Sequence, residues 1–147
     1  MTERCKHLHS ECGLPNTEKP PLPSPPCFTS MEARLLEYDC KKVQVALPVL
    51  ESYLNPAGTM QGGFISAAFD NVFGPLCLLA TGTPHTAALN LSTTYHRPLF
   101  QGDELVITAT VQSHGKTAIH MIAEGYNQDG KLVATSSTSY IIKQNPK

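Results

Sequence analysis

The sequence predicts an α+β domain in which a curved antiparallel β-sheet packs over one helix, and three observations carry this prediction. Residues 62–80 are apolar on almost every side of a helix, which is the pattern of a helix buried in a core. After this stretch, apolar residues alternate with polar ones in the two-residue period of β-strands. Tight turns separate the alternating segments, and strands joined by tight turns pair antiparallel.

The chain begins with a segment unlike the rest. Six of the 12 prolines fall between Pro15 and Pro26, and proline disfavours helix interiors and central strands because it lacks an N–H donor. We therefore expect residues 1–27 to form an extended, polyproline-like tail and residues 28–147 to form the folded domain. The tail also holds four potential zinc ligands: Cys5, His7, His9 and Cys12. Because zinc fingers place paired ligands around a folded element, we interpret these residues as a solvated tail and expect no metal site.

The folded domain opens with short elements and continues with the main helix. Residues 29–38 are expected to begin as a short helix and to continue as a strand, and residues 43–47 alternate as a strand that Pro48 ends. The main helix begins at Gly62 and runs to about Ala80, with Gly82 as its C-terminal stop. Four strands follow, and they form an antiparallel meander. They are expected at residues 87–95, 105–111, 119–123 and 131–142.

Composition narrows the classes of function. The net charge is −1 with neutral histidines, whereas nucleic acids and anionic membranes reward clustered basic charge. No apolar run approaches the roughly 18 residues of a transmembrane helix, so we expect no membrane partner. Charged residues make up only 16% of the chain, which predicts self-association. Five irregularly spaced cysteines and an N-terminus without a signal-peptide pattern argue against a disulfide framework and predict a cytoplasmic location.

One acidic residue stands alone in the apolar helix. Asp70 is the only Asp or Glu between Glu51 and Asp103, and no Lys or Arg occurs between Lys42 and Arg97. Either Asp70 faces solvent or binds a neighbour, or it is an enclosed carboxylate kept for chemistry. The helix pattern offers it no polar face, which favours the second interpretation. Such a carboxylate is suited to act as a general base towards water, or as a nucleophile.

The turn before the helix supplies a second candidate for chemistry. Gly62 and Gly63 open the helix, where glycine allows a ligand to approach the backbone closely. The N–H groups of a first helical turn have no partner within the helix, and the positive end of the helix dipole lies behind them. This arrangement polarises a carbonyl oxygen and holds an oxyanion. Two glycines also occur in an ordinary tight turn before a helix. The pair indicates a ligand site only in combination with the carboxylate seven residues further on.

These residues together form a recognisable pattern. It runs Asn55-Pro56-x-Gly58-Thr59-x-x-Gly62-Gly63-x6-Asp70-Asn71 and continues in Tyr95-His96-Arg97-Pro98 and Gly115-Lys116-Thr117. The pattern resembles that of hotdog-fold acyl-CoA thioesterases of the phenylacetate-degradation (PaaI-like) type, over about residues 29–143. The resemblance implies a sheet wrapped around one long helix and homodimers joined edge to edge, which often pair into tetramers. It also implies active sites at the subunit interface, where the helix Asp of one chain faces the Asn-containing loop of the other.

The resemblance also implies roles for particular residues, with CoA as part of the substrate and no separate cofactor. Asp70 would be the base or nucleophile, Asn55 would orient water or the thioester, and the Gly63 N–H would form the oxyanion hole. Gln61 stands where the family usually has a histidine, so it can donate a hydrogen bond but cannot titrate. The remaining expected contacts with substrate or CoA involve Gly62, Arg97, Lys116 and Thr86; for the two cations an ordinary surface position is the alternative.

A second departure concerns the strand after the helix. A serine often found there in the family corresponds to Ala88, and Thr86 or Thr93 are the expected substitutes for its hydroxyl. Gln61 and Ala88 motivate a rival hypothesis from another class: a non-catalytic hotdog protein that binds acyl-CoA without hydrolysing it. Binding without turnover distinguishes this alternative from the thioesterase.

Overall fold

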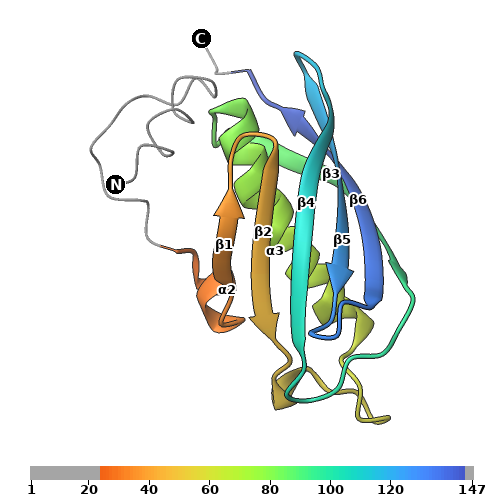
Figure 1. Ribbon diagram of the computed structural model, residues 1–147. Helices are drawn as coiled ribbons and strands as arrows, with labels where there is room; N and C mark the ends of the chain where they lie inside the picture. Colours follow the sequence, from red (N-terminus) through yellow and green to blue (C-terminus); the bar gives the residue numbers. More distant parts are fainter. Residues whose placement is uncertain (1–23, 145–147) are drawn as a thin grey trace.

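The computed structural model describes residues 24–144, and these residues form one antiparallel six-stranded sheet with a long helix against one face (Figure 1). The strands are β1 (Arg34–Tyr38), β2 (Lys42–Pro48), β3 (Thr86–Tyr95), β4 (Glu104–His114), β5 (Ala118–Tyr126) and β6 (Leu132–Ile142). The helices are α2 (Pro26–Ser30), α3 (Gly62–Thr81) and the 3-10 turn η1 (Glu51–Tyr53). The expected α+β architecture, an antiparallel sheet packed over one long helix, is therefore confirmed.

The sheet order is β1-β2-β4-β5-β6-β3, so only part of the chain follows the expected meander. Strands β4, β5 and β6 are consecutive neighbours, but β3 pairs with β6 at the far edge and does not contact β4 as a hairpin partner. The reason lies in the connection after β3. Leu99 is fully buried and its carbonyl accepts from the Met60 N–H at 2.8 Å, so residues 96–103 are tied to the loop before α3 and cross the end of the sheet.

Helix α3 forms the centre of the core, as its composition predicts. Phe69, Phe73 and Leu76 are fully buried against the sheet, and each such side chain contributes about 2–3 kcal/mol through removal from water. The helix ends at Gly82, which adopts φ 69° and donates its N–H to the Leu78 carbonyl. By length and composition alone, Gly62–Thr81 is also apolar enough to span a membrane, contrary to the expectation from apolar runs. Its packing against the sheet accounts for this apolarity.

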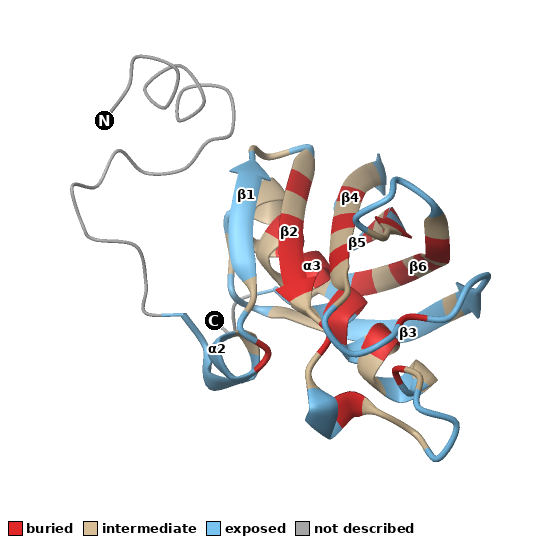
Figure 2. Cartoon of the chain, turned by 60° about the horizontal axis from the view of Figure 1, so that its bottom comes forward, coloured by how far each residue is buried: buried red, intermediate tan, exposed pale blue. Residues whose placement is uncertain are grey.

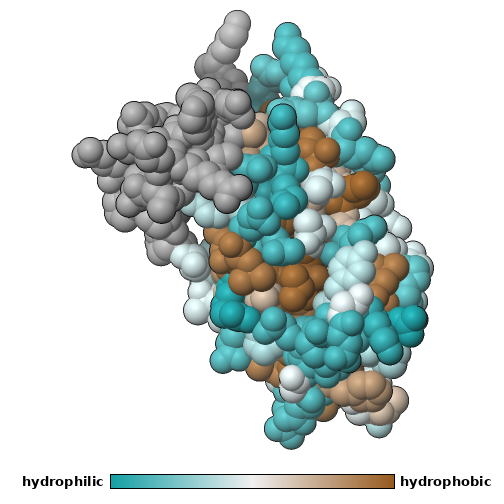
Figure 3. Space-filling view, viewed as in Figure 1, coloured by the Kyte–Doolittle hydropathy of each residue, from teal (hydrophilic) through white to brown (hydrophobic). Residues whose placement is uncertain are grey.

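The two faces of the sheet differ in the way that alternation predicts. Along β4, Leu105, Ile107 and Ala109 face α3 and are fully buried, while Thr108 and Thr110 lie on the opposite face. Figure 3 views this opposite, outer face, where hydrophilic and hydrophobic residues are interspersed and hydrophobic ones gather over β1 and β2.

Both edge strands are exposed. Figure 2 shows β1 and β3 mostly in the colour of exposed residues, whereas β2, β4 and β6 carry buried positions. On β1, Leu35 and Leu36 remain about half exposed, and on β3 Leu89 is 62% exposed at a register shift in its pairing with β6. A free edge with apolar side chains is a template for pairing with another chain.

The N-terminal part of the described chain contacts α3. The short helix α2 spans Pro26–Ser30 and so begins three residues before the expected position, because Phe28 and Thr29 both donate to the Pro25 carbonyl. The Asn71 side chain donates to the Cys27 carbonyl at 3.2 Å, which fixes α2 to the middle of α3. The four potential metal ligands of the predicted tail lie outside the described residues. Of the tail itself only residues 24–27 are described, so the domain boundary stays a prediction.

The described cysteines differ in state. Cys27 and Cys77 are free thiols, and Cys40 in the turn between β1 and β2 is disulfide-bonded. This bond departs from the reduced cysteines that the expected cytoplasmic location implies. The buried environment of Cys77 raises the pKa of its thiol above the ordinary value.

Candidate active site

The start of α3 presents open backbone N–H groups, as the two glycines predict. Gln61 is the N-cap residue, and its carbonyl accepts from the N–H groups of Phe64 and Ile65 at 3.0 and 3.2 Å. Its side chain makes no capping hydrogen bond. Within residues 24–144, no acceptor is recorded for the Gly63 N–H, and the space where a Gly63 side chain would lie is open to 4.0 Å. The Gly63 N–H is therefore available to a ligand.

Gly62 has a different role from Gly63, which the sequence analysis did not separate. A Cβ added at Gly62 would lie 2.9 Å from Tyr95 Cζ, closer than carbon atoms approach each other. The Tyr95 hydroxyl donates to the Gly62 carbonyl at 2.8 Å and lies 2.7 Å from Ser66 Oγ. Gly62 thus allows Tyr95 to hold the first turn of α3 against the end of β3. The signal for this contact in the sequence was only a tyrosine at the end of a strand.

Asn55 organises the loop that leads into α3. Its Oδ1 accepts from the N–H groups of Ala57 and Thr59 at 3.0 and 3.1 Å, and its Nδ2 donates to Thr59 Oγ1 at 3.0 Å. These bonds close residues 55–59 into a compact turn, with Gly58 at φ 77°. An amide NH₂ has two hydrogens, so one N–H of Asn55 remains for a ligand.

Asp70 lies on an exposed face of α3, which corrects the expectation of an enclosed carboxylate. In the single chain Gly63, Ala67 and Asp70 are exposed and Gly74 is half-buried, and their spacing places them on one stripe of the helix. The stripe was missed because its other members are small and apolar, so they read as core. The Asp70 carboxylate is held from the sheet side: the Tyr140 hydroxyl donates to Oδ1 at 3.1 Å.

Asp70 and Gly63 of one chain do not reach the same atom. They are seven residues apart on one stripe, and a helix rises 1.5 Å per residue, so their Cα atoms are about 10 Å apart along the axis. An aspartate side chain is far shorter than that separation. The two groups that the chemistry needs are thus present on one exposed face, but a single chain does not bring them together.

Comparison with known proteins then identifies the family. A family model described as the thioesterase superfamily matches residues 57–134, which include the start of α3, Asp70 and Lys116. Human acyl-coenzyme A thioesterase 13 is 34% identical over 96 residues, which cover 63% of this chain and 67% of that protein. The chain belongs to the thioesterase superfamily. The expected class, a thioester hydrolase with a PaaI-like hotdog fold, is confirmed.

Solved structures of the superfamily share the fold of this thioesterase. The Escherichia coli PaaI protein from the phenylacetic acid degradation operon has a TM-score of 0.74 and 24% identity, covering 80% of this chain and 84% of that one. A hypothetical thioesterase from Streptococcus pneumoniae, solved with coenzyme A, has a TM-score of 0.70 and 20% identity, covering 82% and 93%.

The expected CoA-binding cations of this thioesterase lie at opposite ends of one chain. Arg97 follows β3 at the end where α3 begins, and its N–H donates to the Val133 carbonyl. Lys116 lies in the turn between β4 and β5, at the end where β3 and β6 pair Thr86 with Ile142. Both are exposed, and within residues 24–144 neither belongs to a recorded ion pair. A single chain therefore does not present them to one CoA molecule.

The expected hydroxyl substitutes for Ala88 do not contact Asp70. Thr86 is the first residue of β3, at the end of the strand away from Tyr95 and the start of α3. Thr93 Oγ1 lies 3.0 Å from Ser136 Oγ. The hydroxyl that does contact Asp70 belongs to Tyr140, a residue that the sequence analysis did not single out. It was hidden because alternation in β6 marks Tyr140 only as one more core position.

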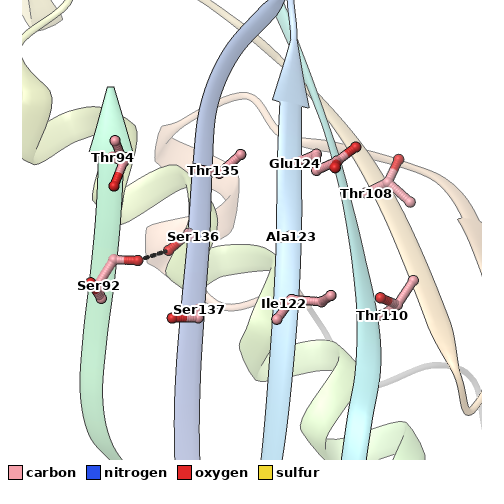
Figure 4. Close-up of a pocket in the computed structure, with 10 residues that line it drawn as sticks. All are labelled: Ser92, Thr94, Thr108, Thr110, Ile122, Ala123, Glu124, Thr135, Ser136 and Ser137. Carbon is pink, nitrogen blue, oxygen red and sulfur yellow. Dashed lines mark hydrogen bonds between the residues drawn. The ribbon is translucent and has the colours of Figure 1, made fainter. Parts of the chain in front are cut away.

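A separate hollow lies on the outer face of the sheet, away from α3 (Figure 4). Its volume is about 520 Å³, and hydroxyl side chains such as Thr94, Thr108 and Thr135 line it together with Ile122 and Glu124. None of the predicted catalytic residues lines this hollow. The candidate active site is accordingly the exposed stripe of α3 and not this depression.

Proposed function

We propose that the protein hydrolyses acyl-CoA thioesters, with Asp70 as general base or nucleophile and the Gly63 N–H as the oxyanion donor. The observation that carries the proposal is the exposed stripe of α3, where a lone carboxylate shares a face with an unpaired helix N-terminus. The substrate class is supported by the human relative, whose name is acyl-coenzyme A thioesterase, and by the coenzyme A in the Streptococcus pneumoniae structure.

The chemistry follows from these two groups. In the general-base form, Asp70 accepts a proton from a water molecule, and the water oxygen attacks the thioester carbon. The negative charge that develops on the carbonyl oxygen is stabilised by the Gly63 N–H and the positive end of the α3 dipole. Collapse of the tetrahedral intermediate breaks the C–S bond, and the CoA thiolate leaves as the carboxylic acid forms. These steps need no separate cofactor.

Two neighbouring side chains assist in this proposal. Asn55 closes the loop before α3 and has one amide N–H left to orient the water or the thioester. Gln61, at the N-cap and without a capping bond, is free to donate to the thioester carbonyl. Because Gln61 cannot titrate, it takes no part in proton transfer, and Asp70 is left as the acid–base group.

We further propose that the active site is shared between the two chains of a homodimer. Asp70 and Gly63 of one chain are about 10 Å apart along the helix, so a partner must supply one of them. The exposed edge of β3, with Leu89 pointing out, is suited to pair with the same strand of a second copy. Antiparallel pairing of the two β3 strands also brings Arg97 of one chain towards the end of the sheet that carries Lys116 in the other chain. Pairing of two such dimers into a tetramer and a cytoplasmic location stay predictions.

The activity is tested by thiol release from a panel of acyl- and aryl-CoA esters. We expect wild-type protein to hydrolyse members of the panel and Asp70→Asn to lose about 100-fold or more in kcat/KM. Asp129→Asn, in the exposed turn between β5 and β6, is the matched control and keeps wild-type activity. Full activity of Asp70→Asn refutes the assigned role. If wild type binds CoA esters but does not hydrolyse them, the protein is the non-catalytic acyl-CoA-binding protein that Gln61 and Ala88 suggested.

The shared site is tested by mixing two inactive variants. In a dimer of one Asp70→Asn chain and one Gly63→Ala chain, one of the two sites contains both an intact Gly63 and an intact Asp70. After subunit exchange we expect the mixture to recover about a quarter of wild-type activity, since half of the dimers are mixed and each has one working site. If both residues act within one chain, the mixture stays inactive. Sedimentation of each variant checks that it assembles like the wild type.

A further inference from the structure

Asp70 receives a hydrogen bond from the last strand of the sheet. The Tyr140 hydroxyl on β6 donates to Asp70 Oδ1 at 3.1 Å, across 70 residues of sequence. Tyr140 is only 7% exposed, so its ring is fixed by the core while Asp70 faces outward from α3. Within residues 24–144 this is the one side-chain hydrogen bond recorded for Asp70.

The strands beside Tyr140 offer no other donor at that level. Tyr140 pairs with Ala88 on β3 and with Ile119 on β5, and neither side chain has a polar atom. A phenol reaches further from the backbone than a serine or threonine hydroxyl, which explains how a residue on β6 contacts the middle of α3. The Tyr140 hydroxyl is therefore placed to control the orientation of the Asp70 carboxylate.

We propose that Tyr140 is a positioning residue of the active site: its hydroxyl holds Asp70 Oδ1 and leaves Oδ2 free to accept the proton of the attacking water. This inference rests on the proposed function, because it assigns to Tyr140 a task only if Asp70 performs the chemistry. A fixed carboxylate keeps its free oxygen in one direction, which saves the reorganisation that a rotating side chain needs.

The protonation of Tyr140 suits this task. Burial is the larger cause that raises the pKa of Tyr140 well above the ordinary value for tyrosine, and the facing Asp70 raises it further. The phenol thus keeps its proton and remains a donor over the whole range in which a thioesterase is assayed. The ionisable groups that face Tyr140 are Asp70 and the Cys77 thiol, both on α3. The ion pairs recorded among the described residues, Arg34–Glu104 and Lys42–Glu37, lie elsewhere.

The experiment compares two tyrosine-to-phenylalanine variants. Tyr140→Phe removes the hydroxyl and keeps the ring. Tyr126→Phe is the matched control, because the Tyr126 hydroxyl also donates to a carboxylate, Glu124 Oε2 at 2.7 Å, but on the outer face of the sheet. We expect Tyr140→Phe to lower kcat about tenfold with KM nearly unchanged, which is the worth of one hydrogen bond to a charged group. Tyr126→Phe keeps wild-type kcat.

The split between kcat and KM separates a positioning role from a structural one. Loss of the donor lets the Asp70 carboxylate rotate, so kcat falls while KM stays near the wild-type value in Tyr140→Phe, and neither constant changes in Tyr126→Phe. Tyr140→Met, which also lacks the donor, shows the same fall in kcat, and thermal melts confirm that each variant is folded at the assay temperature.

The outcomes distinguish this inference from the proposed function. If wild type hydrolyses CoA esters and Asp70→Asn does not, but Tyr140→Phe retains the wild-type kcat, the inference on Tyr140 is overturned and the function stands. If Tyr140→Phe and Tyr140→Met raise KM as strongly as they lower kcat, or are partly unfolded in the melts, Tyr140 has only a structural role and the inference is overturned. If wild type hydrolyses no CoA ester, the proposed function fails first.

Discussion

Replacing each of the two adjacent glycines at the start of α3 by alanine is expected to have opposite consequences: Gly62→Ala lowers stability, and Gly63→Ala lowers activity. Gly62→Ala places a Cβ 2.9 Å from Tyr95 Cζ and 3.1 Å from its hydroxyl, so the Tyr95 side chain must move away. Gly63→Ala places its Cβ in open space, with the nearest atom, Gln61 Oε1, at 4.0 Å. Gly62→Ala therefore tests how Tyr95 holds the start of α3, and Gly63→Ala tests whether a ligand approaches the N–H groups of the first turn.

The magnitude follows from the contacts that Tyr95 loses. Its hydroxyl bonds the Gly62 carbonyl at 2.8 Å and Ser66 Oγ at 2.7 Å, and each such bond contributes about 0.5–1.5 kcal/mol net. Tyr95 is 48% exposed, so its ring swings into solvent without a large repacking cost. Alanine favours a helix over glycine by up to about 1 kcal/mol, but both variants share this gain. The free energy of unfolding should therefore be about 1–3 kcal/mol lower in Gly62→Ala than in Gly63→Ala.

Two assays of the same pair complete the test. Urea denaturation gives the difference in stability, and it should narrow in a Tyr95→Phe background, where the hydroxyl bonds are already absent. Thiol release from a CoA ester gives the reverse order: Gly63→Ala is stable but loses about 100-fold in kcat/KM, because its methyl displaces the thioester from the first-turn N–H groups. Equal stability of the two variants, or wild-type activity of Gly63→Ala, refutes the division of roles.

Two further predictions concern the core and the alkaline range. Gly125→Ala places a Cβ 3.0 Å from Leu105 Cδ1 and 3.2 Å from Phe69 Cζ, both fully buried, so thermal or urea unfolding should show a loss of about 1–3 kcal/mol; an unchanged stability contradicts this packing. Because the pKa of Tyr140 is raised in the folded state, its stabilising contribution is complete below about pH 10 and declines as the unfolded chain ionises above it. Between pH 9 and pH 11, wild type should thus lose about 1 kcal/mol more than Tyr140→Phe in urea titrations, and equal losses would contradict the buried phenol.

Most of the fold could be predicted because local patterns determine it. The apolar stretch beginning at Gly62 and the αL stop at Gly82 mark α3 to within a residue, and alternation marks β3 to β6 to within about three. Strand order could not be predicted, because nothing in the pattern of β3 says that it pairs with β6. The connection after β3 is instead held by a contact distant in sequence: buried Leu99 ties it to the loop before α3.

The candidate site was predictable only as a set of residue types. Asp70 stood out because it is alone, and Gly63 because glycine opens the helix, but the exposed stripe that contains both is made of small residues that resemble core. Contacts between side chains distant in sequence were not readable at all. The Tyr95 bond to Gly62 and the Tyr140 bond to Asp70 join strand residues to the helix across 33 and 70 positions.

The central claim, that the α3 stripe is where thioesters are cleaved, is tested most directly by a crystal structure of Asp70→Asn with an uncleaved acyl-CoA. The account predicts the thioester carbonyl oxygen about 2.7–3.1 Å from a Gly63 N–H, with residue 70 of the partner chain beside the carbonyl carbon or the attacking water. An acyl-CoA seated in the hollow on the outer face of the sheet, among Thr108, Ile122 and Thr135, would contradict it.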